Sequence, residues 1–238
     1  MSADSMAEPK SKTRQALASA PCLLGQSDSD LSVPLPASEF HGLLNSLSRV
    51  FGLRLPDSKD DPDYRFLSAV AGLFQKTTLG PETILEKHQR PWLNVYLTQH
   101  GVLRLFRETV AGKVAIHHFF TEGDIIWPVF GRTRTVRNTL CLTSVTHCTL
   151  WVANFRAFRA SIQACSGDRW AGFALALIEE LAELSTMREF QKQTLSATER
   201  YAILVREYPE LIRRVPDFQL AAFIGVAPAT FSRLKRAC

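Results

Sequence analysis

The residues with the most recognisable chemistry lie in the segment DFQLAAFIGVAPATFSRLKR, at residues 217–236. Ala221 is small enough to let two helices cross closely, and four residues later Gly225 can adopt a left-handed turn at low steric cost. Pro228 fits the first turn of a second helix, where its missing N–H costs nothing. The apolar residues that would share one inner face are Leu220, Ile224, Val226, Phe231 and Leu234. This spacing predicts a helix-turn-helix.

The second helix of this motif would present an outer face that is small at its start and basic further on. Small residues let a helix approach the major groove, and arginine can donate paired hydrogen bonds to guanine O6 and N7. We expect Arg233 to contact a base. The full set of candidate DNA contacts is Pro228, Ala229, Thr230, Ser232, Arg233, Lys235 and Arg236. The alternative is a helical hairpin with a solvated basic face.

The charge of the chain is concentrated in the same region. Residues 196–238 contain seven Lys or Arg against four Asp or Glu, and the whole chain has a net charge of +5 and an isoelectric point near 9.1. Such an excess favours a polyanionic partner, and phosphate contacts would add a salt-dependent part to the affinity through counterion release.

A long helix is predicted before this region, from Trp170 to Leu195. Its seam alternates steps of three and four residues, which is typical of a coiled coil. The predicted homodimer interface consists of Ala174, Leu177, Leu181, Leu184 and Arg188. The alternative is that this face packs back on the chain's own β domain. Ser196 and Glu199 then form an S-x-x-E capping box, which predicts the start of the next helix.

The middle of the chain is rich in β-forming residues. Short Val, Ile, Thr and aromatic segments, separated by turn formers, indicate an antiparallel sandwich or barrel. The predicted strands are 92–97, 102–106, 114–120, 124–127, 139–145 and 148–152. Two short amphipathic helices, at 39–51 and 64–74, are predicted before them.

Composition excludes several classes of protein. Hydrophobic residues make up 46% and charged residues 21%, as in ordinary globular proteins, and no apolar run is long enough for a membrane helix or a signal core. We therefore expect a cytoplasmic protein with no membrane partner. The five cysteines are widely spaced, and His117 and His118 are adjacent on a predicted strand and point to opposite faces, so no metal site is predicted. No catalytic motif indicates an enzyme.

The β-rich domain, the long helix and the C-terminal helix-turn-helix together resemble the Crp/Fnr family of bacterial transcription regulators, over residues 38–238. The strongest match is VPDFQLAAFIGVAPATFSRLKR. The Arg-Glu pair that opens the recognition helix in better known members is replaced here by Pro228-Ala229, whereas Thr230 and Arg233 are kept. The resemblance therefore implies DNA binding but not a particular operator.

The resemblance implies an α+β fold: an N-terminal β jelly-roll of the cyclic-nucleotide-binding type, a long dimerisation helix and a C-terminal winged-helix-like domain with the helix-turn-helix. The expected divisions are a disordered tail at 1–37, a sensor domain at 38–165, a dimerisation helix at 166–195 and a DNA-binding domain at 196–238.

In that family the β domain binds a cyclic nucleotide through a Gly-Glu pair for the ribose and an Arg-Ser pair for the cyclic phosphate. Here Trp127-Pro128 stands where Gly-Glu is expected, and Arg137-Asn138 where Arg-Ser is expected. Half of the cassette is missing, so no cyclic nucleotide cofactor is expected, and a different small-molecule effector stays an open alternative. The candidate ligand contacts are Arg132, Arg134, Arg137 and Asn138, with a solvated arginine cluster as the alternative interpretation.

These observations predict a homodimeric, sequence-specific DNA-binding transcription regulator that is not an enzyme. Its expected partners are double-stranded DNA and a second copy of the chain, with RNA polymerase as a further candidate. The competing hypothesis is a ligand-binding or scaffold protein whose C-terminal helices contact a protein partner.

Overall fold

The structure is a computed structural model, and it describes residues 36–88, 90–109, 112–127 and 140–237. The helices in these ranges are α2 (Ala37–Val50), α3 (Pro62–Ala71), α4 (Phe155–Cys165), α5 (Gly167–Thr194), α6 (Ala197–Glu207), α7 (Pro209–Arg214), α8 (Asp217–Ile224) and α9 (Pro228–Ala237). The strands are β1 (Gln75–Leu79), β2 (Ile84–Glu86), β3 (Asn94–His100), β4 (Leu103–Glu108), β5 (Val114–Phe120), β6 (Ile125–Ile126), β7 (Leu140–Ser144) and β8 (Cys148–Asn154). The predicted tail lies outside the described residues up to residue 35.

The strands form two antiparallel sheets, with the orders β1-β8-β3-β6 and β2-β7-β4-β5. Side chains of both sheets meet in one apolar core that includes Tyr96 and Leu150 from the first sheet and Leu103 and Leu142 from the second. All four of these side chains are fully buried. The predicted combination of a β jelly-roll with C-terminal helices is confirmed at the level of fold class.

Segments rich in Val, Ile, Thr and aromatic residues located the strands that contribute most to the core, and these predictions are confirmed within the described residues. Two strands, β1 and β2, were not predicted. The sequence of β1 is QKTTL, which has one large apolar residue, and β1 lies at a sheet edge where it pairs only with β8. β2 has three residues and a register shift between Ile84 and Glu86. Neither segment forms a long run of Val, Ile, Thr and aromatic residues, which is the pattern on which the predictions depend.

The turn between β3 and β4 depends on Gly101. This residue has φ = +109°, and a Cβ atom there would lie 2.5 Å from Cys148 Sγ and 2.6 Å from the carbonyl oxygen of His147. Any side chain would therefore clash as well as strain the backbone.

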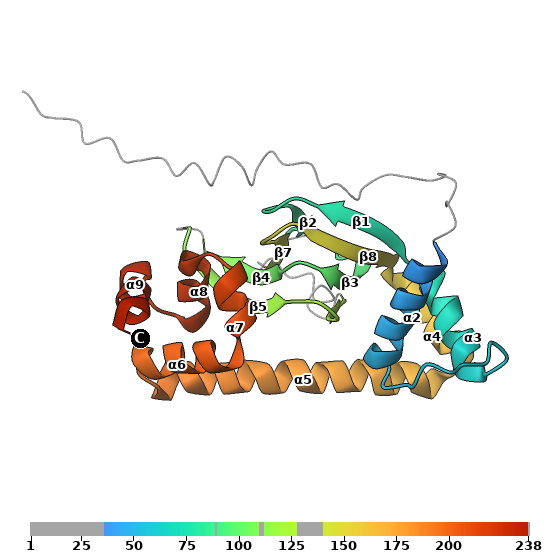
Figure 1. The fold of residues 1–238 in the computed structure, drawn as a ribbon. Helices are drawn as coiled ribbons and strands as arrows, with labels where there is room; N and C mark the ends of the chain where they lie inside the picture. The colour runs from blue at the N-terminus through green and yellow to red at the C-terminus, as the bar shows by residue number, and fades with distance from the viewer. Residues whose placement is uncertain (1–35, 89, 110–111, 128–139, 238) are drawn as a thin grey trace, which may run out of the picture.

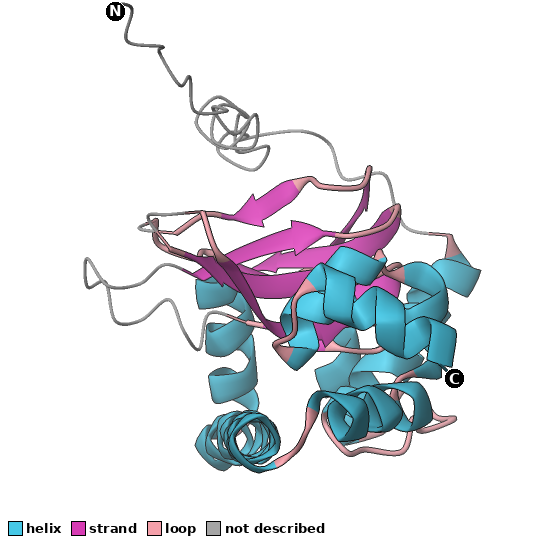
Figure 2. Cartoon of the chain, turned by 90° about the vertical axis from the view of Figure 1, so that its left-hand side faces the viewer, coloured by secondary structure: helices cyan, strands magenta, loops and turns pink. Residues whose placement is uncertain are grey.

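Helix α5 runs along one side of the β domain and joins two groups of helices (Figure 1). α2, α3 and α4 lie near its N-terminal end, and α6 to α9 lie near its C-terminal end. Figure 2 shows α5 end-on beneath the strands. The long helix predicted for Trp170 to Leu195 is confirmed to within a few residues at its start.

Candidate nucleic-acid interface

The C-terminal helical region begins at the predicted capping box. The backbone N–H of Glu199 donates to Ser196 Oγ at 3.3 Å, and the backbone N–H of Ser196 donates to Glu199 Oε2 at 2.8 Å. These two bonds satisfy donors that would otherwise be unpaired at the start of α6. Within residues 196–237 the structure contains helices and no strand that would form a wing.

The helix-turn-helix consists of α8, a turn at Gly225 and α9. Gly225 has φ = +71° and ψ = 39°, in the left-handed region that the sequence predicted. The backbone N–H of Val226 donates to the carbonyl of Ala221 at 2.9 Å, which closes the end of α8. α9 then starts at Pro228, as predicted.

The inner face of the motif is the one that the spacing predicted. Leu220, Ile224 and Phe231 are buried, and Val226 and Leu234 are half-buried. These side chains pack with Tyr201 of α6, whose ring lies 5.3 Å from that of Phe231 between centroids. The apolar contacts therefore fix the orientation of α9.

The opposite face of α9 is open. Thr230 is half-buried, and the other predicted contact residues are exposed: Pro228, Ala229, Ser232, Arg233, Lys235 and Arg236. Arg233 Nη2 donates to Thr230 Oγ1 at 3.3 Å, and Arg236 Nε donates to the carbonyl of Ser232 at 3.2 Å. The structure thus places the predicted residues together on one surface.

Lys235 differs from the other predicted contacts because it already has a partner. Its Nζ donates to the two carboxylate oxygens of Asp217 at 2.9 and 3.0 Å, and this pairing raises the pKa of Lys235. Asp217 is in the first turn of α8, so the pair connects the two helices of the motif. A DNA phosphate would have to compete with this carboxylate for Lys235.

An unpredicted contact docks α8 on the β domain. Phe223 of α8 packs against Phe119 of β5 with ring centroids 5.1 Å apart, and both side chains belong to one continuous hydrophobic cluster. Beside it, Gln219 Nε2 donates to Glu82 Oε1 at 3.2 Å. The pairing could not be read from the sequence because the partners are more than 100 residues apart.

Glu122 forms a polar clamp at the edge of this contact. Its carboxylate accepts from Arg214 Nη1 at 2.8 Å and Nη2 at 2.6 Å, and from the backbone N–H of Gly101 at 2.9 Å. The hydrogen bonds from Arg214 lower the pKa of Glu122 to about 2. The clamp joins α7 to two turns of the β domain.

Helix α5 turns the predicted dimer seam toward its own chain. Ala174 and Leu177 pack against the core cluster near α4, and Leu181 and Leu184 line a cavity of about 260 Å³ between α5 and the β domain. Arg188 lies over the ring of Phe223 at 4.5 Å. In the single chain these residues therefore follow the alternative of packing on the chain's own domains.

The outward face of α5 carries large apolar side chains that were not among the predicted interface residues. Leu175 is 56% exposed, Ile178 46% and Phe190 55%. Leu175, Ile178, Ala182 and Ser185 follow steps of three, four and three residues, which is the seam spacing on a stripe rotated by one residue, about 100°, from the inner one. The sequence contains this second stripe, but the prediction chose the other stripe because it is longer.

The predicted ligand contacts Arg132, Arg134, Arg137 and Asn138 lie outside the described residues. Trp127, which stands where the family has the first residue of its ribose-binding pair, is 5% exposed. Its indole packs edge-on against Trp170 at 5.2 Å between centroids. This position therefore serves the hydrophobic core in the present chain.

The described residues offer little support for a reactive thiol, a metal site or a membrane span. Cys141 and Cys148 are buried, and burial raises the pKa of both thiols, which disfavours the reactive thiolate. No group of three or more metal-ligating side chains occurs there. No helix within the same ranges combines bilayer-spanning length with a sufficiently apolar composition.

No protein-family model and no curated protein sequence matches the chain. Solved structures do resemble it. The c-di-GMP-responsive global regulator CLP of Xanthomonas campestris aligns with a TM-score of 0.59 and 14% identity, over 73% of this chain and 90% of that one. A proposed transcriptional regulator of the Crp/Fnr family from Eubacterium rectale aligns with a TM-score of 0.59 and 13% identity, over 73% and 82%.

FixK2 of Bradyrhizobium japonicum aligns with a TM-score of 0.56 and 15% identity, over 69% of this chain and 83% of that chain. The fold is therefore of the class that combines a β roll, a long helix and a C-terminal helical domain. More particularly, it is the fold of Crp/Fnr-type transcription regulators.

Proposed function

We propose that the chain is a homodimeric, sequence-specific DNA-binding transcription regulator of Crp/Fnr type, without enzymatic activity. The observation that carries this proposal is the helix-turn-helix itself: an apolar inner face fixes α9, and the outer face of α9 is open, small at its start and basic further on. That combination is suited to insertion into a major groove. RNA polymerase is a further candidate partner.

Homodimerisation through α5 is the second part of the proposal. The exposed stripe that contains Leu175 and Ile178 offers an apolar seam to a second copy, since the inner seam is engaged within the chain. A twofold dimer would present two copies of α9 to half-sites about 34 Å apart on one face of a duplex.

The sensor domain would respond to an effector other than a cyclic nucleotide, or to none. Support for this comes from Trp127, which is packed in the core at a position that the family uses for the ribose. A signal in the β domain could reach the helix-turn-helix through the direct contact of β5 with α8.

The decisive experiment selects binding sites from a library of duplex DNA with the wild-type protein, Arg233→Ala and Arg206→Ala. Arg206 is an exposed arginine of α6 that pairs with Glu207, so its removal costs the same charge without touching α9. Loss of a base contact should cost about 1–3 kcal/mol and relax the selected sequence. Arg206→Ala should retain the wild-type sites.

The proposal is wrong if the wild-type protein selects no sequence. It is also wrong if Arg233→Ala and Arg206→Ala reduce binding by the same amount at every site. The latter outcome would indicate only general attraction between a basic domain and a polyanion.

A further inference from the structure

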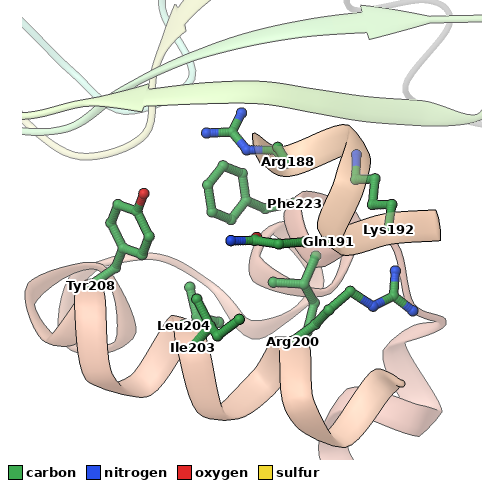
Figure 3. A pocket seen from close by; sticks show the side chains of 9 residues that line it. Arg188, Gln191, Lys192, Arg200, Ile203, Leu204, Tyr208 and Phe223 are labelled. Carbon is green, nitrogen blue, oxygen red and sulfur yellow. The ribbon is translucent and has the colours of Figure 1, made fainter. Parts of the chain in front are cut away.

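A small pocket lies where the C-terminal end of α5 meets α6 and α8 (Figure 3). Its charged lining consists of Arg188 and Lys192 from α5 and Arg200 from α6. Leu204 and Phe223 supply apolar walls. Three cationic residues from two helices therefore line one pocket, with Lys192 close enough to the other two for both charges to lower its pKa.

Among the described residues, no ion pair involves Arg188, Lys192 or Arg200, although many other cations of the protein are paired. Arg188 is hydrogen-bonded to the side chain of Tyr208 and lies over Phe223. The Nε atom of Arg200 is buried without a hydrogen-bond partner.

The arrangement is unfavourable for the protein alone. Lys192 has an exposed side chain, and partial burial together with the charges of Arg188 and Arg200 lowers its pKa. Burial also lowers the pKa of Arg188. Partly desolvated like charges and the buried, unpaired Nε of Arg200 cost free energy, and a bound anion would offset these costs.

We propose that this pocket binds the phosphate group of a small anionic molecule. Three cations match a dianion better than a single carboxylate, and guanidinium groups donate to phosphate oxygens in pairs. The enclosed pocket volume is about 30 Å³, which is too small for a whole nucleotide. The remainder of the ligand would extend toward solvent.

The surroundings favour a small molecule over the backbone of a duplex. Helices line the pocket, and a strand of the β domain crosses above it (Figure 3). The strand is close enough for the charge of Arg188 to lower the pKa of His118 on β5. A duplex is too wide to enter this space, whereas a free phosphate ester is not.

Binding here would have a mechanical consequence, which rests on the proposed function. Because Arg188 and Lys192 belong to α5 and Arg200 belongs to α6, one anion would hold the long helix and the DNA-binding region in a fixed relation. Arg200 Nη1 also lies 3.3 Å from the position that a Cβ atom would take at Gly225, next to the turn that leads into α9. The ligand would thus act at the joint that orients α9.

The experiment is a titration of the full chain with inorganic phosphate, followed by ³¹P NMR and calorimetry at constant ionic strength in chloride. Lys192→Met should weaken phosphate binding at least tenfold, and Lys192→Met with Arg200→Gln should abolish it. Lys76→Met is the matched control, because Lys76 is paired with Glu39 on the other side of the fold. It should bind phosphate as the wild type does.

A second measurement uses thermal unfolding without phosphate. Lys192→Met should raise the midpoint because it removes repulsion, whereas Lys76→Met should leave it unchanged or lower it. The proposal is overturned if the wild type shows no saturable phosphate binding, or if Lys192→Met and Lys76→Met bind it equally.

A third measurement adds a short DNA duplex to the protein with bound phosphate. Inorganic phosphate bound in the pocket should not be displaced by duplex DNA, and Lys192→Met should then bind duplex within twofold of the wild type. Displacement by the duplex would identify the DNA backbone as the source of the phosphate and overturn the proposal. The phosphate titration requires no DNA. Its result can therefore be interpreted even if the protein does not bind DNA as proposed.

Discussion

At its N-terminal end α5 packs Trp170 and Phe173 into an aromatic cluster, whereas at its C-terminal end it meets α6 and α8 through Arg188 and Lys192. The ring of Phe173 lies 4.8 Å from that of Phe51 and 5.9 Å from that of Phe158 between centroids. The other end has one cation–π contact and three unbalanced charges around a pocket.

The difference indicates where the molecule can respond to a signal. Apolar burial is non-directional and carries no charge that a bound anion would change, so it holds one end of α5 in place. A cluster of like charges changes its free energy when an anion binds. A regulator that shifts between two arrangements is therefore expected to pivot at the cationic end.

The largest predicted effect comes from breaking the apolar end. Phe173 is 8% exposed and contacts several aromatic rings. Phe173→Ala should lower the free energy of unfolding by about 3–5 kcal/mol, through lost burial and the cavity left behind. Urea denaturation measures this change.

Met187→Ala is the control on the same helix, because Met187 is 50% exposed. It should change stability by less than about 0.5 kcal/mol. Equal effects of the two substitutions would mean that the N-terminal end of α5 is not anchored by its aromatic cluster.

The second prediction concerns the outward stripe of α5. The double substitution Leu175→Lys and Ile178→Lys should convert the proposed dimer into a folded monomer, because charges in an apolar seam repel and remain solvated only when the helices separate. We expect the dissociation constant to rise at least a hundredfold in sedimentation equilibrium. Met187→Lys, outside the stripe, should leave the dimer intact.

The third prediction tests the polar clamp beside the cationic end. Glu122→Gln should cost about 1 kcal/mol at pH 7, since the pair with Arg214 is partly exposed and screened. The pKa of Glu122 is lowered to about 2, so its contribution is complete above about pH 4.5. The contribution is lost as the pH falls toward 2.

Unfolding curves of wild type and Glu122→Gln should therefore differ at pH 7 and converge in acid. Glu39→Gln, which removes a surface pair with Lys76, is the control and should change stability by less than about 0.5 kcal/mol. A gap between wild type and Glu122→Gln that stays constant down to pH 2 would contradict the role given to the clamp.

The sequence predicted those parts of the structure that depend on local chemistry. Ser196 with Glu199 predicted a helix start, and Gly225 with Ala221 predicted a left-handed turn between two helices. In each case a few neighbouring residues determine the backbone. The exposed face of α9 followed from the same periodicity, since the inner positions identify the outer ones.

The contacts that the sequence did not predict depend on which helix faces pack against the β domain. Two neighbouring stripes of α5 have the same regular spacing, and periodicity alone does not say which stripe packs on the β domain. The contact of Phe119 with Phe223 joins segments more than 100 residues apart along the chain, and the pocket at Arg188 and Arg200 is completed by Phe223 of α8. Only the folded arrangement brings such residues together.

The smallest predicted effect is a shift in the pKa of His118, which lies near Arg188 at the cationic end of α5. Burial lowers the pKa of His118 to about 4, and the charge of Arg188 contributes to this shift. Arg188→Met keeps an apolar contact with Phe223 but removes the charge, so the pKa of His118 should rise by less than about one unit. Because His118 stays buried in this variant, its pKa should remain below the usual 6.5.

The sign for stability follows from the lowered pKa. In the unfolded chain histidine takes up a proton near pH 6.5, whereas in the folded chain His118 does so near pH 4, so stability falls as the pH drops through this interval. Arg188→Met brings the pKa of His118 in the folded chain closer to 6.5. The substitution should therefore reduce the loss of folding stability in acid by less than about 1.4 kcal/mol. NMR titration of the histidine rings measures the pKa directly.

Arg107→Met is the matched control, because Arg107 lowers the pKa of the neighbouring His117 and has no such effect on His118. It should shift His117 and leave His118 unchanged. If Arg188→Met leaves the pKa of His118 where it was, the end of α5 does not impose its charge on β5. The joint would then lack the electrostatic coupling that distinguishes it from the aromatic end, and an anion bound there would not be sensed by the β domain.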